Sequence, residues 1–106
     1  MEVIHFRAEE WKSGPVMIAA SFVERWRGLR GAESEAAILL RTSAVHGVGM
    51  GRPFRAVGLS ENYRVLDTRL VAQGRFARFR KCKWVLEIPA DVRPPKPGQT
   101  LELVDD

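Results

Sequence analysis

A glycine-rich loop in the middle of the chain brings together side chains that could bind an anion. The loop spans residues 45–55 and reads VHGVGMGRPFR. Its alternating glycines allow close approach of the backbone to a ligand, while an imidazole, two guanidinium groups and a ring offer side-chain contacts. The candidate ligand-binding residues are His46, Gly49, Met50, Arg52, Phe54 and Arg55. The alternative is a structural loop in which His46 satisfies buried backbone groups and Met50 fills the core.

A second candidate site is a run of positive charge further along the chain. The segment RFARFRKCK at residues 75–83 interleaves five basic residues with two phenylalanines. Residues 41–83 contain ten basic residues and two acidic ones, a net charge of +8, whereas the whole chain carries +4. Arginine and aromatic rings together hold phosphates and stack bases, although arginine also covers apolar surface and pairs with acids. The candidate nucleic-acid-binding residues are Arg75, Arg78, Arg80, Lys81 and Lys83.

Few residues have the side-chain type and spacing that catalysis or metal binding requires. The single cysteine, Cys82, lies between two lysines, which favour a thiolate, but strand alternation places it on the apolar face of residues 82–88. We therefore expect a small buried thiol, and a hydrolase or transferase that used His46 with Cys82 or Asp67 would require these side chains to meet in space. The two histidines and one cysteine show no metal-ligand spacing. The sequence predicts no catalytic residue, no metal site and no cofactor, and it favours binding over catalysis.

The elements that must position these residues are mostly short strands. Ser21 and Glu24 form a capping box at the start of an amphipathic stretch, which predicts one main helix over about residues 21–30. Alternating or apolar runs predict strands at 2–7, 16–19, 37–40, 56–60, 63–71, 75–79, 82–88 and 100–104. The predicted fold class is α+β, mainly β, with a small bent or barrel-like sheet of six or more strands and one helix.

Length and composition indicate one globular domain over residues 1–106. The chain is 45% hydrophobic and 28% charged, which excludes a disordered or fibrous class. One cysteine fits a reducing compartment, no apolar run approaches the ~20 residues of a membrane span, and the first residues show no signal-peptide pattern. We expect a basic cytoplasmic protein that does not enter a membrane.

An ordered series of motifs resembles a known family. The motifs are SFVERWRGL (21–29), ILLRTSAVHGVGM (38–50), Pro53, WVLEIPA (84–90) and PGQTLELV (97–104). Over about residues 16–106 the chain is similar to the prokaryotic family called domain of unknown function 192, and the segment from His46 to Pro53 matches its His-x-x-Gly-Met-x-x-Pro motif. The resemblance implies a compact, mainly β domain with a conserved loop and no assigned activity.

The chain departs from this family at two points. The family usually has an aspartate two positions after the loop proline, where this chain has Arg55, and its usual C-terminal glycine-aspartate is Gly98-Gln99 here. If that aspartate binds a ligand or metal in the relatives, this chain has lost or reversed the role.

The sequence thus favours a non-enzymatic binding or accessory module. The loop at 45–55 would accept a small anionic ligand or a protein partner. The alternative is sequence-independent nucleic-acid binding through residues 75–83. The oligomeric state is left open, since an unpaired edge strand could also serve dimerisation.

Overall fold

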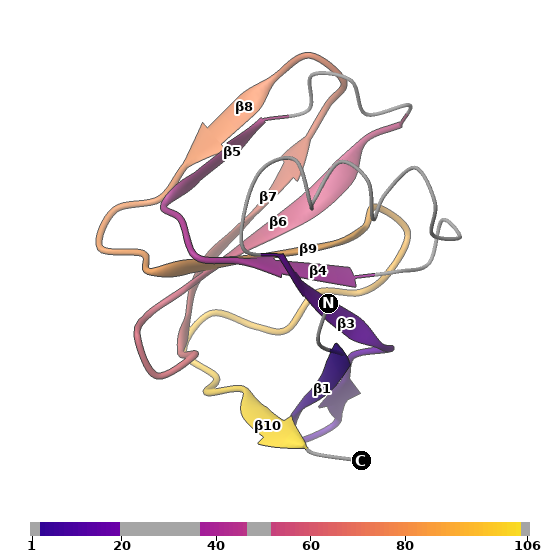
Figure 1. Ribbon diagram of the computed structural model, residues 1–106, viewed down its shortest axis with the longest axis vertical. Coiled ribbons are helices and arrows are strands. Elements are labelled where there is room, and N and C mark those ends of the chain that lie inside the picture. Colours follow the sequence, from indigo (N-terminus) through magenta and orange to yellow (C-terminus); the bar gives the residue numbers. More distant parts are fainter. Residues whose placement is uncertain (1–2, 20–36, 47–51, 105–106) are drawn as a thin grey trace.

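The computed structural model describes residues 3–19, 37–46 and 52–104. These residues form ten strands, which Figure 1 shows as two sheets of unequal size. The strands are β1 (Val3–Ala8), β2 (Trp11–Lys12), β3 (Val16–Ala19), β4 (Ala37–Leu40), β5 (Ala44–His46), β6 (Phe54–Leu59), β7 (Val65–Val71), β8 (Phe76–Arg78), β9 (Trp84–Pro89) and β10 (Glu102–Val104). The main sheet has the order β10-β1-β3-β4-β9-β6-β7, with β2 paired to β1, and β5 pairs with β8 in a separate two-stranded sheet.

The main sheet curls into a half-barrel whose two ends are linked by backbone hydrogen bonds. The start of β7 lies beside the segment that leads into β10. The Val65 N–H donates to the Gln99 carbonyl (2.7 Å), the Gly98 N–H donates to the Val65 carbonyl (2.8 Å), and the Leu101 N–H donates to the Tyr63 carbonyl (2.9 Å). These bonds satisfy edge groups that would otherwise need water or another strand.

An inner core fills the hollow of this curl. It takes side chains from nearly every strand of the main sheet, among them Phe6 of β1, Leu39 of β4, Leu59 of β6 and Leu86 of β9, each no more than 1% exposed. On β1 the alternate residues are the buried ones, because successive strand side chains point to opposite faces. The central strand β4 is buried at every position, as expected of a strand that is covered on both faces.

An outer core lies between the main sheet and the small β5–β8 sheet. It contains Ile38, Ala56 and Val85 of the main sheet and Ala77 and Phe79 of the segment around β8. A Cβ atom at Gly58 would lie 2.7 Å from two atoms of the Phe79 ring. Glycine at this position of β6 is therefore what allows the ring to pack directly on the strand backbone.

The structure corrects the predicted fold class. The described residues are all-β and contain no helix, so the expectation of an α+β fold with one main helix is wrong. The predicted helix at 21–30 falls on residues outside the described part of the chain. The capping pattern is a local signal, whereas the packing that defines the fold is strand against strand in both cores. The bent, barrel-like sheet is confirmed.

Two further differences from the expected elements are small. β2 and β5 have two and three residues, and neither was predicted. β5 falls within the glycine-rich stretch, yet Ala44–His46 pair with Phe76–Arg78 of β8.

The described residues contain no helix of the length and hydropathy needed to cross a bilayer.

Candidate functional site

The outer face of the β5–β8 sheet carries an exposed phenylalanine. In β8, Ala77 is buried in the outer core, so its neighbours Phe76 and Arg78 point the other way. Phe76 is 65% exposed, the most exposed large hydrophobic side chain of the described residues, whereas Phe79 is 3% exposed. An apolar ring left in water amid charged groups offers a stacking surface that a buried ring does not.

Residues 75–83, the segment that contains this ring, also carry five exposed cations, and we call them the basic strip. They are Arg75, Arg78, Arg80, Lys81 and Lys83. The ion pairs that the structure shows among the described residues are Arg7–Glu102, Arg41–Glu61 and Arg69–Asp67. None includes a member of the basic strip. Of the C-terminal acids, Glu102 pairs with Arg7 of β1 and Glu87 is buried in β9.

Backbone hydrogen bonds fix the path of the basic strip. The Phe79 N–H donates to the Ser43 carbonyl (2.9 Å) and the Lys83 N–H donates to the Leu59 carbonyl (2.8 Å). Between these points the chain turns at Lys81, which has a φ of 59°. The cationic side chains are therefore exposed groups on a backbone held by hydrogen bonds, an arrangement suited to holding an extended polyanion.

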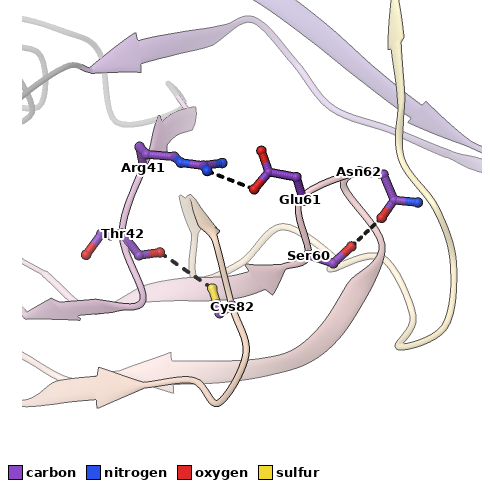
Figure 2. A network of polar contacts seen from close by, with 6 residues as sticks. All are labelled: Arg41, Thr42, Ser60, Glu61, Asn62 and Cys82. Carbon is purple, nitrogen blue, oxygen red and sulfur yellow. Dashed lines mark hydrogen bonds and ion pairs between the residues drawn. The ribbon is translucent and has the colours of Figure 1, made fainter.

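Cys82 lies on the inner side of this turn (Figure 2), where its Sγ is 2.7 Å from the Trp84 carbonyl oxygen and 3.5 Å from that of Thr42. The side chain is buried, as predicted. Burial raises the pKa of the thiol, an effect that the nearby backbone hydrogen bonds partly oppose. A neutral thiol bonded to carbonyl groups is a packing residue and a poor nucleophile.

An ion pair on the surface near this cysteine, Arg41–Glu61, is an example of an arginine whose charge is neutralised within the chain. Arg41 follows β4, and its guanidinium contacts Glu61 at 2.8 Å while lying 4.8 Å from the centre of the Trp84 ring. Figure 2 shows the two charged side chains pointing toward one another above Ser60, which bonds Asn62 at 2.6 Å. The hydrogen bond from Arg41 lowers the pKa of the Glu61 carboxyl. This arginine is committed to partners within the chain.

The residues predicted to form the anion-binding loop are divided between the two sheets. His46 is at the end of β5 opposite Phe76, whereas Arg55 is on β6 between Leu70 of β7 and Ile88 of β9. Phe54 is buried in the outer core, so alternation directs Arg55 to the opposite face of the main sheet. Gly49 and Met50 lie outside the described residues.

Arg55 nevertheless has an unusual environment. It is half-buried, and its Nε atom is buried without a hydrogen-bond acceptor among the described residues. A guanidinium N–H that is shielded from water normally has an acceptor, because the cost of leaving it unpaired is high. Arg52 is exposed and lies two residues before β6. The described residues contain no group of three or more metal-ligating side chains.

Sequence reasoning identified the basic strip but did not include Phe76 in the site. The available signal was the alternation of residues 75–79, which places Phe76 and Arg78 on one face and Ala77 and Phe79 on the other. That pattern does not tell which face is inside. The small sheet could be oriented only once its packing on β6 was known.

Comparison with known proteins identifies the fold and assigns no activity. No family model and no curated protein sequence matches the chain. A Novosphingobium aromaticivorans protein of unknown function has a TM-score of 0.68 at 13% identity, over 94% of this chain and 83% of its own. A Sinorhizobium meliloti protein described as a candidate transcription regulator has a TM-score of 0.72 at 16% identity, over 96% of this chain and 94% of its own. At these identities the likeness shows a shared fold alone, and the resemblance to domain of unknown function 192 stays a prediction.

Proposed function

We propose that the protein is a non-enzymatic binding module that holds single-stranded nucleic acid on the outer face of its β5–β8 sheet. The observation that carries the proposal is Phe76, which is 65% exposed in a segment whose cations form no ion pair among the described residues. Of these cations, Lys83 is close enough to Glu61 for its charge to help Arg41 lower the pKa of that carboxyl. Single-stranded binding sites combine aromatic rings, on which bases stack, with positive side chains that follow the backbone. A ring can stack only on a base whose own face is open, which favours a single strand over a duplex.

The alternative explanation of the basic strip is a solvated surface. Arg7, Arg41 and Arg69 are exposed and each has a carboxylate partner, whereas Arg52, Arg64 and Arg93 are exposed and form no ion pair among the described residues. Lack of a carboxylate therefore does not by itself set the basic strip apart. Its distinguishing feature is five exposed cations within nine residues that also include an exposed phenylalanine. The description of the Sinorhizobium meliloti protein as a candidate transcription regulator fits a nucleic-acid partner for this fold.

Fluorescence anisotropy with a labelled oligothymidylate of about 16 nucleotides tests the proposal. We expect binding that weakens steeply with salt. Arg78→Ala with Arg80→Ala should reduce the slope of log K against log salt by about 1.4, since each phosphate contact on a single strand contributes about 0.7. Phe76→Ala should weaken binding about fivefold or more. A duplex of the same length should bind more weakly.

Matched controls lie at the other end of the molecule. Arg7→Ala removes an exposed arginine from β1, and Leu103→Ala removes a 48% exposed apolar side chain from β10. Figure 1 shows these strands at the end of the sheet remote from β8. Neither control should change affinity. Absence of binding at low salt, or equal losses in the controls, would overturn the proposal.

Binding of a small anion at Arg55 is the second candidate function, and its support is the buried Nε atom without a described acceptor. An oxyanion accepts well-aligned hydrogen bonds from a guanidinium. Inorganic phosphate should then raise the unfolding temperature of the wild type and leave Arg55→Gln unaffected, while Arg52→Gln loses part of the effect. Arg64→Gln, at an exposed position outside the loop, is the control. Equal stabilisation of Arg55→Gln and the wild type excludes this site.

A further inference from the structure

β7 is an edge strand of the main sheet over most of its length. Within the described residues it pairs with β6 on one side. On the other side its first residue, Val65, exchanges hydrogen bonds with Gly98 and Gln99, and residues 66–71 have no strand partner there in the described part of the chain. Free N–H and C=O groups along an edge form a template on which another strand can add.

Two exposed leucines make the free edge of β7 apolar. Leu66 is 36% exposed and Leu70 is 58% exposed, and they are two of the five exposed large hydrophobic side chains of the described residues. β7 contains neither proline nor lysine, the residues that most often prevent strands from adding to an edge. Its charged residues are Asp67 and Arg69, which have opposite signs.

The sequence of β7 is complementary to itself when reversed. Around Thr68 the strand reads Val-Leu-Asp-Thr-Arg-Leu-Val, so each apolar residue has an apolar counterpart at the same distance on the other side. The acid at 67 has a base at 69 as its counterpart. Two such strands, placed antiparallel with Thr68 opposite Thr68, bring opposite charges face to face twice and leucine against leucine twice. Cross-strand pairs of these kinds stabilise antiparallel sheets.

We propose that two copies of this chain associate through β7, antiparallel and centred on Thr68, with Asp67 of each copy facing Arg69 of the other. In the single chain Asp67 uses its carboxylate locally: Oδ1 accepts the Thr68 N–H (2.9 Å) and Oδ2 contacts the Arg69 Nε (3.3 Å). Both side chains of that ion pair are about half exposed, at 52% and 50%. Pairing exchanges these contacts for equivalent ones across the two-fold axis, with a backbone carbonyl of the other copy accepting the Thr68 N–H.

The opposing interpretation is that Asp67 guards the edge. A carboxylate that occupies an edge N–H blocks the approach of a second strand, and charges on edges often serve this purpose. The two interpretations differ in what the arginine does. A guard needs only the acid, whereas a self-complementary edge needs both signs at equal distances from Thr68.

Sedimentation equilibrium over micromolar to millimolar concentrations tests the proposal through charge exchange. The wild type should dimerise reversibly. Asp67→Arg alone and Arg69→Asp alone should each weaken dimerisation about tenfold or more, because each dimer then contains two like-charge contacts. The double variant Asp67→Arg with Arg69→Asp should restore it.

Mixing the two single variants gives the sharpest outcome. Each is self-repulsive, but in the mixed pair every position at 67 or 69 faces the opposite charge, so the mixture should dimerise where neither component does. Urea unfolding of each variant verifies the fold, and Thr68→Pro, which removes the central N–H from an edge strand where proline is tolerated, should also abolish dimerisation. A monomeric wild type at millimolar concentration overturns the proposal. A mixture that stays monomeric, or an Asp67→Arg variant that dimerises more strongly than the wild type as a lost guard predicts, also overturns it.

Discussion

The two faces of residues 75–83 differ in what they do with the same types of side chain. On the inner face, Ala77, Phe79 and Cys82 are no more than 5% exposed and pack into the outer core. On the outer face, Phe76 is 65% exposed among cations. The segment thus buries one phenylalanine almost completely and leaves another, three residues away, in water. The same segment can bury an aromatic ring, so the exposure of Phe76 is a property of that position.

The comparison separates residues that hold the small sheet in place from residues that the small sheet displays. Among the described residues, neither β5 nor β8 pairs with a strand of the main sheet, so inner-face packing and a few backbone hydrogen bonds attach the small sheet. Outer-face residues can therefore be changed without affecting stability, and inner-face residues cannot.

The largest effect on stability should come from replacing Phe79 with alanine, and the same replacement at Phe76 is the comparison. Phe79→Ala should lower the free energy of unfolding by about 3–5 kcal/mol, since it leaves a cavity against Gly58 that the strand backbone cannot fill. Phe76→Ala should change it by less than about 0.5 kcal/mol. Urea denaturation of the two variants beside the wild type measures both. Comparable losses in the two variants would contradict the division between the faces.

Cys82 should give a smaller effect that depends on pH. Its pKa is raised by burial from an ordinary value of 9.0, so the unfolded thiol ionises at a lower pH than the native one. Its contribution to stability is therefore complete below that ordinary value and is lost as the pH rises through the native pKa. Urea midpoints from about pH 7 to about pH 10 should fall more steeply for the wild type than for Cys82→Ala.

All other ionisable side chains are the same in the two proteins, so only the difference in slope between the proteins reports on the thiol. A native thiol that reacts with a disulfide reagent as fast as the unfolded chain would contradict the buried state.

The strands that could be predicted from the sequence are those whose pattern is local. Apolar runs at 16–19 and 37–40 coincide with β3 and β4, because a strand covered on both faces is apolar at consecutive positions. β5 could not be predicted, because its partner β8 lies about thirty residues further on and three residues carry little pattern. The predicted helix gave too much weight to a local capping signal in assigning the fold class.

The candidate sites were predictable in composition but not in arrangement. The loop sequence suggests that His46 and Arg55 act together, since they are only nine positions apart. They lie on strands of different sheets, and strand alternation directs Arg55 away from the outer core. The basic strip was visible as charge, yet the exposure of Phe76 depends on Phe79 occupying the space above Gly58, a contact between residues 21 positions apart.

The smallest effect should come from an arginine that does have a partner. Arg41 lowers the pKa of Glu61 below its ordinary value of 4.5, so the contribution of the pair is present above that value and is lost as the pH falls through the native pKa. Both side chains are well exposed, which keeps the contribution small and sensitive to salt. Glu61→Gln should lower the urea midpoint slightly at neutral pH and low salt, and not at all in high salt or acid.

Glu102→Gln removes the carboxylate of another exposed pair and is the matched control. At neutral pH its effect should be equally small and equally sensitive to salt, because the Arg7–Glu102 pair is equally open to water. A Glu61→Gln loss that persisted in high salt would mean that Arg41 needs its carboxylate to stay over the Trp84 ring. The paired arginines would then be structural residues, and the contrast with the unpaired cations of the basic strip would be stronger than the charges alone imply.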